Sequence, residues 1–173
     1  MKTLIFCGTH NSGKTTLLVR AVSALSKRGL SVFAVKHSPR MVRWSENTRP
    51  GDAERLLDAG AERVVLAGSG FTVRFEPSKE PVVGGPSGLS EILESLKGDS
   101  EKYVLIEGYK SSREPIQRIV FGKNEREIRD LADGRTVGFS GMGSEGLEIT
   151  GIPHLPLTVG ENELADFIAG LFT

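Results

Sequence analysis

Residues 8 to 15 read Gly-Thr-His-Asn-Ser-Gly-Lys-Thr, which matches the phosphate-binding loop pattern G-x-x-x-x-G-K-T, here called the P-loop motif. An apolar run at residues 3–7 precedes the motif, and an amphipathic segment follows from about Lys14. This order predicts a strand, a glycine-rich loop and a helix. The two glycines allow a curvature that turns several N–H groups toward one phosphate, and the helix N-terminus adds partial positive charge.

The last residues of the motif have the chemistry that a triphosphate requires. Lys14 is expected to reach the β- and γ-phosphates, and the Thr15 hydroxyl is expected to ligate Mg²⁺. The alternative is a surface turn that contains glycine, lysine and threonine by chance, but the flanking strand and helix favour the phosphate loop. The motif identifies neither the base nor what happens to the phosphate.

Composition limits the remaining choices. The 173 residues have no formal net charge and are 38% hydrophobic, so we expect one P-loop nucleotide-binding domain over residues 1–173. A neutral chain without a long apolar run predicts neither nucleic acid nor membrane as a partner. The lone cysteine, Cys7, cannot form an internal disulfide, and we find no N-terminal signal peptide. These features predict a cytoplasmic protein.

Hydrophobic periodicity predicts alternating strands and helices, which is typical of an α/β fold with a mostly parallel sheet flanked by helices. Strands are expected at residues 2–8, 30–35, 62–67, 71–75, 103–106, 116–121, 137–139 and 155–159. Helices are expected at residues 14–28, 52–58, 89–96, 125–132 and 162–171. The first strand, helix and strand form a βαβ unit, so the first two strands should be parallel.

Two features interrupt this alternation. The strands at residues 62–67 and 71–75 flank a Gly-Ser-Gly turn, which predicts an added β-hairpin with an exposed edge suited to dimerisation. Residues 38–51 are interrupted by Pro39, Pro50 and Gly51 and carry frequent arginine and serine, so we expect a long loop there. Residues 76–87 are rich in proline and glycine, which predicts a linker.

A carboxylate follows a second buried strand. Residues 103–106 read Tyr-Val-Leu-Ile and are followed by Glu107. A P-loop needs an acid at the end of a neighbouring strand to organise Mg²⁺, and ligands of α/β sheets bind at this edge. Aspartate is commoner at this position, and Glu107 could instead simply end the strand. Gly108 permits a close backbone turn beside it.

Asp52 is the second carboxylate candidate. It follows the long loop after the second strand, where a segment would cover the γ-phosphate. Aspartate is also a favoured N-cap, so Asp52 has a purely structural explanation as the residue that heads its helix. We keep both interpretations.

Several basic side chains flank these candidates, and charge alone does not select among Lys36, Lys110 and Arg113. His37 is a candidate to contact phosphate or a partner, or is simply solvated at a strand end. The long loop carries Trp44 and a small arginine cluster. The guanine-reading pattern N-K-x-D is absent, because residues 122–125 read Gly-Lys-Asn-Glu.

Short motifs in a fixed order resemble the MobB family, the molybdopterin-guanine dinucleotide biosynthesis B proteins. They are the P-loop motif continued by Thr16 and Leu17, then Val35-Lys36-His37, then Pro50-Gly51-Asp52-x-x-Arg55 running into Ala59-Gly60-Ala61, and finally Leu105-Ile106-Glu107-Gly108-Tyr109-Lys110. The resemblance covers about residues 1–125, and the tail with its apolar segment and closing helix is similar too.

The resemblance implies a homodimeric GTP-binding protein that uses Mg²⁺, hydrolyses GTP weakly, and assists the guanylyltransferase that attaches GMP to molybdopterin. It implies that Thr15, Asp52 and Glu107 form the Mg²⁺ site, and that Asp52 and Glu107 position the water as candidate catalytic residues. The phosphate contacts implied or proposed are those of Gly8, Thr9, His10, Asn11, Ser12, Gly13, Lys14, Thr15 and Thr16, with Lys36 and His37 added from the second strand end.

The chain departs from the family pattern after its Lys-His pair. Many relatives carry further histidines and an aspartate there, whereas this chain reads Ser38-Pro39-Arg40-Met41. Arg40 and Arg43 are therefore candidates to bind an anionic pterin phosphate. Two other functions remain open: a small-molecule kinase with an arginine lid formed by Arg40, Arg43 and Arg49, and an adaptor that binds without chemistry.

Overall fold

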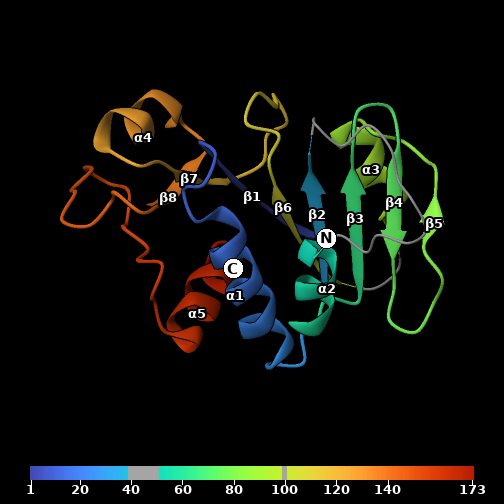
Figure 1. Ribbon diagram of the computed structural model, residues 1–173. Helices are drawn as coiled ribbons and strands as arrows, with labels where there is room; N and C mark the ends of the chain where they lie inside the picture. The colour runs from blue at the N-terminus through green and yellow to red at the C-terminus, as the bar shows by residue number, and fades with distance from the viewer. Residues whose placement is uncertain (39–50, 99–100) are drawn as a thin grey trace.

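The computed structural model describes residues 1–38, 51–98 and 101–173. Within these ranges a sheet of eight strands runs in the order β5-β4-β3-β2-β6-β1-β7-β8 (Figure 1). The strands are β1 Lys2–Gly8, β2 Val32–His37, β3 Arg63–Ala67, β4 Thr72–Phe75, β5 Val82–Val83, β6 Tyr103–Glu107, β7 Arg118–Phe121 and β8 Thr136–Ser140. The six strands from β3 to β8 in this order are parallel, and β4 and β5 add antiparallel at one edge.

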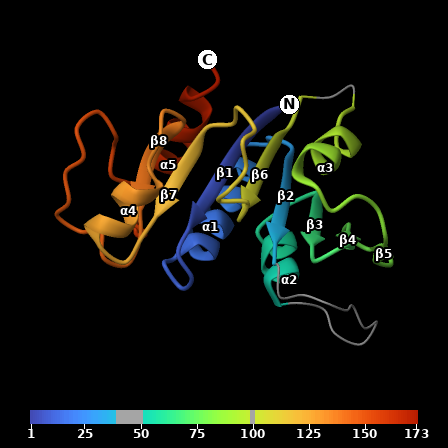
Figure 2. The same ribbon diagram turned by 90° about the horizontal axis from the view of Figure 1, so that it is seen from above.

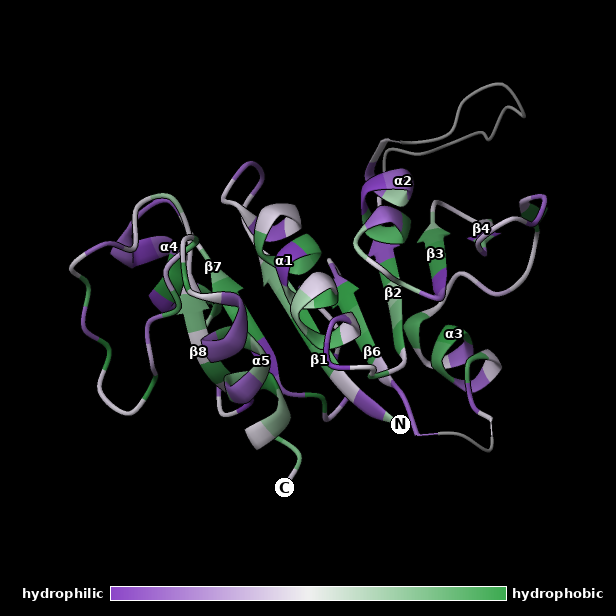
Figure 3. Cartoon of the chain, turned by 90° about the horizontal axis from the view of Figure 1, so that it is seen from below, coloured by the Kyte–Doolittle hydropathy of each residue, from purple (hydrophilic) through white to green (hydrophobic). Residues whose placement is uncertain are grey.

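Helices cover both faces of the sheet, as the predicted α/β class requires. They are α1 Lys14–Ser26, α2 Gly51–Asp58, α3 Leu89–Ser95, α4 Glu125–Leu131 and α5 Glu161–Gly170. One apolar cluster joins α1, α2 and α5 to one face, and a second joins α3 and α4 to the other. Figure 2 shows these two layers from above, and Figure 3 shows the apolar strands of the sheet interior between them.

The order of the central strands decides what lies at the carboxyl edge of the sheet. β1 and β2 are parallel as predicted, but they are not neighbours, because β6 lies between them. In the register of these strands, Glu107 pairs with Phe6 on one side and with Lys36 on the other. The end of β6 therefore lies directly between the P-loop motif and the end of β2.

The predicted secondary structure is wrong for two segments, residues 76–87 and residues 155–159. The linker at residues 76–87 contains β5, which pairs with β4 and is extended by the bond from Thr72 Oγ1 to the Gly84 carbonyl, 2.8 Å. Residues 155–159 are not a strand, because Arg20 donates to the carbonyls of Leu157 and Val159 and so takes groups that a ladder would need. Pro156 also lacks a backbone N–H.

The helix that carries Asp52 begins one residue earlier than predicted. α2 starts at Gly51, so Asp52 lies in the first turn and is not the N-cap. A carboxylate in the first turn is still favourable because of the helix dipole. Across the described ranges, no helix combines the length and apolar composition that crossing a bilayer requires. Trp44, Arg40, Arg43 and Arg49 lie outside the described residues.

Candidate functional site

The backbone of the P-loop motif is shaped by close packing at its two glycines. Gly13 has φ +97°, and a Cβ at this position would lie 2.7 Å from Leu157 Cδ1. A Cβ on Gly8 would lie 2.1 Å from the Phe121 carbonyl oxygen at the end of β7. A side chain at either position would overlap Phe121 or Leu157 and displace the loop. The glycines predicted to curve the loop are therefore needed for packing as well.

Side chains within the loop hold its shape. Ser12 Oγ donates to the Thr9 carbonyl at 2.8 Å, and the Lys14 ammonium donates to the same carbonyl. Burial lowers the pKa of Lys14, and the nearby Glu107 carboxylate opposes that shift. Thr9 Oγ1 donates to Glu127 Oε2 at 2.8 Å, which ties the loop to α4. The loop is therefore held from α4 as well as by its own contacts.

The predicted acid Glu107 lies beside the predicted metal ligand Thr15. Thr15 Oγ1 donates to Glu107 Oε2 at 2.8 Å. The strand register explains this contact, because Glu107 ends β6 next to β1 and faces the side of the sheet that α1 covers. The Glu107 side chain is only 9% exposed, so its charge needs nearby partners.

Lys36 is the cationic partner of the Glu107 carboxylate. Its ammonium lies 3.0 Å from Glu107 Oε2, 3.0 Å from Thr15 Oγ1 and 2.9 Å from Asp52 Oδ2. Asp52 is 38% exposed and also pairs with Arg55 at 3.8 Å. Three oxygens from β6, α1 and α2 thus converge on one cationic group from β2.

A pocket of about 1260 Å³ opens above these groups. It is lined by the P-loop motif, the ends of β2 and β6, the first residues of α3, and the loop that follows β6. Its volume exceeds the 300–1,000 Å³ that is usual for a small-molecule site. The pocket therefore has room for a nucleotide and a further group.

An aromatic pair forms part of this pocket. The rings of His37 and Tyr109 stack with centroids 4.3 Å apart, and Tyr109 Oη donates to the Ser87 carbonyl at 3.1 Å. Burial raises the pKa of Tyr109 to about 12 and lowers the pKa of His37. Gly108 makes the close approach possible, with φ +105° and a Cβ position only 3.0 Å from His37 Cβ. Burial therefore disfavours the charged form of both rings.

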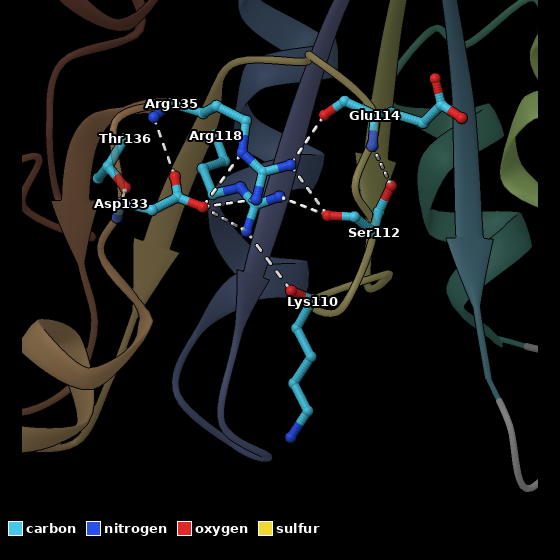
Figure 4. Close-up of polar contacts among 7 residues, drawn as sticks. All are labelled: Lys110, Ser112, Glu114, Arg118, Asp133, Arg135 and Thr136. Carbon is cyan, nitrogen blue, oxygen red and sulfur yellow. Dashed lines mark hydrogen bonds and ion pairs between the residues drawn. The ribbon is translucent and has the colours of Figure 1, made fainter.

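Two arginines donate hydrogen bonds to backbone carbonyls of the loop that follows β6 (Figure 4). Arg118, only 3% exposed, donates to the carbonyls of Lys110 at 3.4 Å and Ser112 at 3.1 Å. Arg135 donates to the carbonyls of Ser112 and Glu114, both at 2.9 Å. Asp133 pairs with both guanidinium groups, and the hydrogen bond from Arg135 holds the pKa of that carboxyl below its usual value. We call Arg118, Asp133 and Arg135 the arginine clamp.

The sequence-predicted site residues come together in this pocket. It is lined by Gly8, Thr9, His10, Asn11, Ser12, Gly13, Lys14, Thr15, Thr16, Lys36, His37, Asp52 and Glu107. Lys110 also lines it, whereas Arg113 is exposed on the loop outside the lining.

Several residues that line the pocket were not predicted as site residues from the sequence. These are the start of α3 with Leu89 and Ser90, the loop residues Tyr109, Ser111, Ser112 and Glu114, and the separate residues Ser38, Arg55 and Met142. The loops after β6 and β8 follow predicted strands at the same sheet edge, which is the signal that points to them. Nothing in the sequence pattern points to the arginine clamp, because Arg118 lies on β7 whereas Asp133 and Arg135 lie in the loop before β8.

Fold and site together define a mixed α/β protein with its candidate site at the carboxyl edge of a mostly parallel sheet. The model of the family "Molybdopterin guanine dinucleotide synthesis protein B", MobB, matches residues 3–135. The chain belongs to this family. The match includes every described residue of the candidate site except Met142.

Relatives agree with this assignment. The chain is 29% identical over 118 residues to the molybdopterin-guanine dinucleotide biosynthesis adapter protein of Haemophilus influenzae, a match covering 68% of this chain and 61% of that protein. Two structures of Bacillus subtilis MobB superpose with TM-scores of 0.56 and 0.58 at 23% and 21% identity. The first covers 92% of this chain and 91% of the other, and the second covers 100% and 99%. A MobB homologue from Bacillus stearothermophilus gives 0.56 at 23% identity, with 99% and 95% covered, so the fold is shared.

Proposed function

We propose that this chain binds GTP with Mg²⁺ at the P-loop motif and assists the guanylyltransferase step of molybdopterin-guanine dinucleotide synthesis. The family and the adapter name of the Haemophilus influenzae relative support the pathway. Because the matched region spans 61% of that relative's length, the role of the whole protein is part of the proposal. Guanine in the family's product supports GTP over ATP.

One observation carries the nucleotide part of the proposal: the bond of 2.8 Å between Thr15 Oγ1 and Glu107 Oε2. It joins the hydroxyl of a phosphate loop to the acid of a neighbouring strand, which is the pair that P-loop proteins use beside the phosphates. A threonine in a chance surface turn has no reason to meet a buried acid from a strand more than 90 residues away in sequence.

The residues present fit Mg²⁺. Oxygens of Thr15, Asp52 and Glu107 already surround one cationic group at 2.9–3.0 Å. Mg²⁺ prefers oxygen ligands and is usually bound through one or two carboxylates plus substrate phosphates. We therefore assign these three residues to hold it. When bound, Mg²⁺ would neutralise charge that develops on the transferred phosphate.

Protein groups would do the rest of the chemistry. The Lys14 ammonium and the backbone N–H groups of the P-loop motif would stabilise charge on the phosphates. Asp52, the more exposed of the two acids, would orient a water for in-line attack. Both Asp52 and Glu107 are ion-paired with Lys36, so each carboxylate already has a cationic partner. Slow hydrolysis is what such a site supports.

The rest of the pocket would accommodate molybdopterin, the second substrate of the proposed reaction. The wall formed by α3 and the loop after β6 carries Ser90 and Ser112, which are hydrogen-bonding groups suited to molybdopterin. At one edge of the sheet, β5 presents Val82 and Val83, which are 49% and 55% exposed. Among the described residues β5 pairs with β4 alone, and this apolar edge supports a homodimer as part of the proposal.

The size of the pocket also favours a second candidate function, transfer of the γ-phosphate to a small acceptor. A volume of about 1260 Å³ leaves room for an acceptor beside a triphosphate. The two functions differ in where the phosphate goes.

A product assay separates the candidates. The purified chain is incubated with radiolabelled GTP and Mg²⁺, with and without molybdopterin and the guanylyltransferase. The proposal predicts slow release of inorganic phosphate and faster formation of the dinucleotide when the chain is present. A phosphorylated acceptor would indicate the kinase instead. If GTP binds but stays unchanged, and the chain has no effect on dinucleotide formation, the result would indicate an adaptor that binds without chemistry.

A variant pair controls for the site. Lys14→Ala should abolish the stimulation and the phosphate release. Lys97→Ala removes the same charge from an exposed position after α3 and should leave both unchanged. Equal activity of Lys14→Ala and the wild type would show that the P-loop motif is not the nucleotide site.

A further inference from the structure

The position of Lys36 is unusual for a lysine beside a metal-type oxygen set. Its ammonium contacts Glu107 Oε2, Asp52 Oδ2 and Thr15 Oγ1 at 2.9–3.0 Å, and its side chain is only 15% exposed. These oxygens belong to three elements that meet only through the order of the sheet. The lysine therefore lies at the centre of the group and not at its rim.

The same oxygens are those assigned above to Mg²⁺. A divalent cation within reach of all three would have to come close to the Lys36 ammonium, and it would be repelled twice as strongly as a unit charge. Burial of Lys36 and Glu107 weakens solvent screening of that repulsion. The lysine and the divalent cation cannot share the oxygens without one of them moving.

We propose that Lys36 is the resident counter-ion of the Thr15, Asp52 and Glu107 oxygens and excludes a free divalent cation until a triphosphate enters. Lysine has a long flexible stem and a compact charge, so it can leave this group for a nearby anion. Phosphate oxygens would give the ammonium a new partner and would add ligands to the cation. The inference rests on the proposed function, because it assumes that this pocket takes a triphosphate with its metal.

The pocket should therefore bind the complex of divalent cation and nucleotide more tightly than it binds either the cation or the nucleotide alone. The protein without nucleotide should bind divalent cations weakly, although it presents two carboxylates and a hydroxyl in one place. Removing the lysine charge should free those oxygens for metal. It should also weaken the nucleotide when no metal is present, because the lysine charge then has no substitute near the phosphates.

Binding of Mn²⁺ tests the competition directly. Mn²⁺ replaces Mg²⁺ and its free concentration is measured by electron paramagnetic resonance on the nucleotide-free full chain. Lys36→Met and Lys36→Gln should each bind Mn²⁺ at least tenfold more tightly than the wild type, and Lys36→Arg should stay within threefold of it. The glutamine variant retains a hydrogen-bond donor for the carboxylates if the methionine variant folds poorly.

Lys110→Met is the matched control. Lys110 lines the same pocket and is exposed, and its side chain extends away from the arginine clamp (Figure 4). Its loss should change Mn²⁺ affinity less than twofold. If it strengthens Mn²⁺ binding as much as Lys36→Met does, the effect is one of general charge and the proposal is wrong.

The outcomes also separate this inference from the proposed function. Unchanged Mn²⁺ affinity in both neutral Lys36 variants, with GTP binding that still depends on Lys14, would overturn the inference alone. Tighter Mn²⁺ binding in those variants, with no GTP binding by the wild type, would support the competition and reject GTP as the ligand. In EDTA, GTP affinity should fall at least tenfold in Lys36→Met, and an unchanged value would contradict the role of Lys36 toward phosphate.

Discussion

Replacing Arg118 with methionine should destabilise the protein and loosen one wall of the pocket. Arg118 is 3% exposed and donates to two carbonyls of the loop after β6, at 3.4 and 3.1 Å. Hydrogen bonds from a charged donor contribute about 1.5–3 kcal/mol each, and the longer of these two belongs at the low end. Its ion pair with Asp133 is long, 3.4 Å, and Asp133 is 36% exposed, so we assign little to it.

A second term reduces the loss. Arg118 Nε has no hydrogen-bond partner among the described residues, and methionine removes that buried unsatisfied group. Replacing a buried charge by an apolar side chain of similar length also removes its desolvation cost. The expected net loss is therefore about 2 kcal/mol, which corresponds to a fall in Tm of roughly 4–8 °C for a chain of this size.

Urea unfolding followed by circular dichroism measures this change, and titration of GTP measures the pocket. Arg113→Met makes the same substitution at an exposed position of the same loop and should change stability by less than about 0.5 kcal/mol. GTP should bind the Arg118 variant several-fold more weakly, because the pocket-lining loop loses its bond at the Lys110 carbonyl and one of two at the Ser112 carbonyl. Wild-type stability of Arg118→Met, or equal losses in both variants, would refute the role of the clamp.

Three further outcomes follow from the site. Glu107→Gln should weaken GTP at least tenfold in Mg²⁺ but much less in EDTA, measured by titration calorimetry, because the lost charge acts through the cation; equal losses in both would contradict this. Gly108→Ala should cost about 1–3 kcal/mol, because φ is +105° and the new Cβ lies 3.0 Å from His37 Cβ, whereas Gly134→Ala, with open space, should be nearly neutral in urea unfolding. Asp133 has a folded pKa below its unfolded value, so the stability it contributes is present above about pH 4 and is lost as pH falls through the folded pKa. Thermal unfolding between pH 5 and pH 2 should therefore show a shallower loss for Asp133→Asn than for the wild type, and parallel curves would exclude this contribution.

The sequence predicts the centre of the fold well because the strongest signals are local. An apolar strand, a glycine loop and an amphipathic helix define β1, the P-loop motif and α1, and all three are found where predicted. Glu107 was recognised because an acid directly after a buried strand must lie at the carboxyl edge of a parallel sheet. The predicted MobB family is confirmed by the family match.

What the sequence could not predict depends on the order of the strands. Lys36 was one of several basic candidates, and only the insertion of β6 between β1 and β2 places it against Glu107. β5 escaped detection because two residues show no periodicity, and its pairing depends on the edge that β4 offers. Arg118 sat within a predicted strand, where nothing marks its guanidinium as the anchor of another loop.

The central claim is that the P-loop motif holds a guanine nucleotide together with a divalent cation. Isothermal titration of GTP and of ATP into the wild type and into Lys14→Ala, each with Mg²⁺, tests it most directly. GTP should bind the wild type at least tenfold more tightly than ATP, and Lys14→Ala should bind neither. Tight ATP binding without GTP binding, or GTP binding that survives the loss of Lys14, would contradict it.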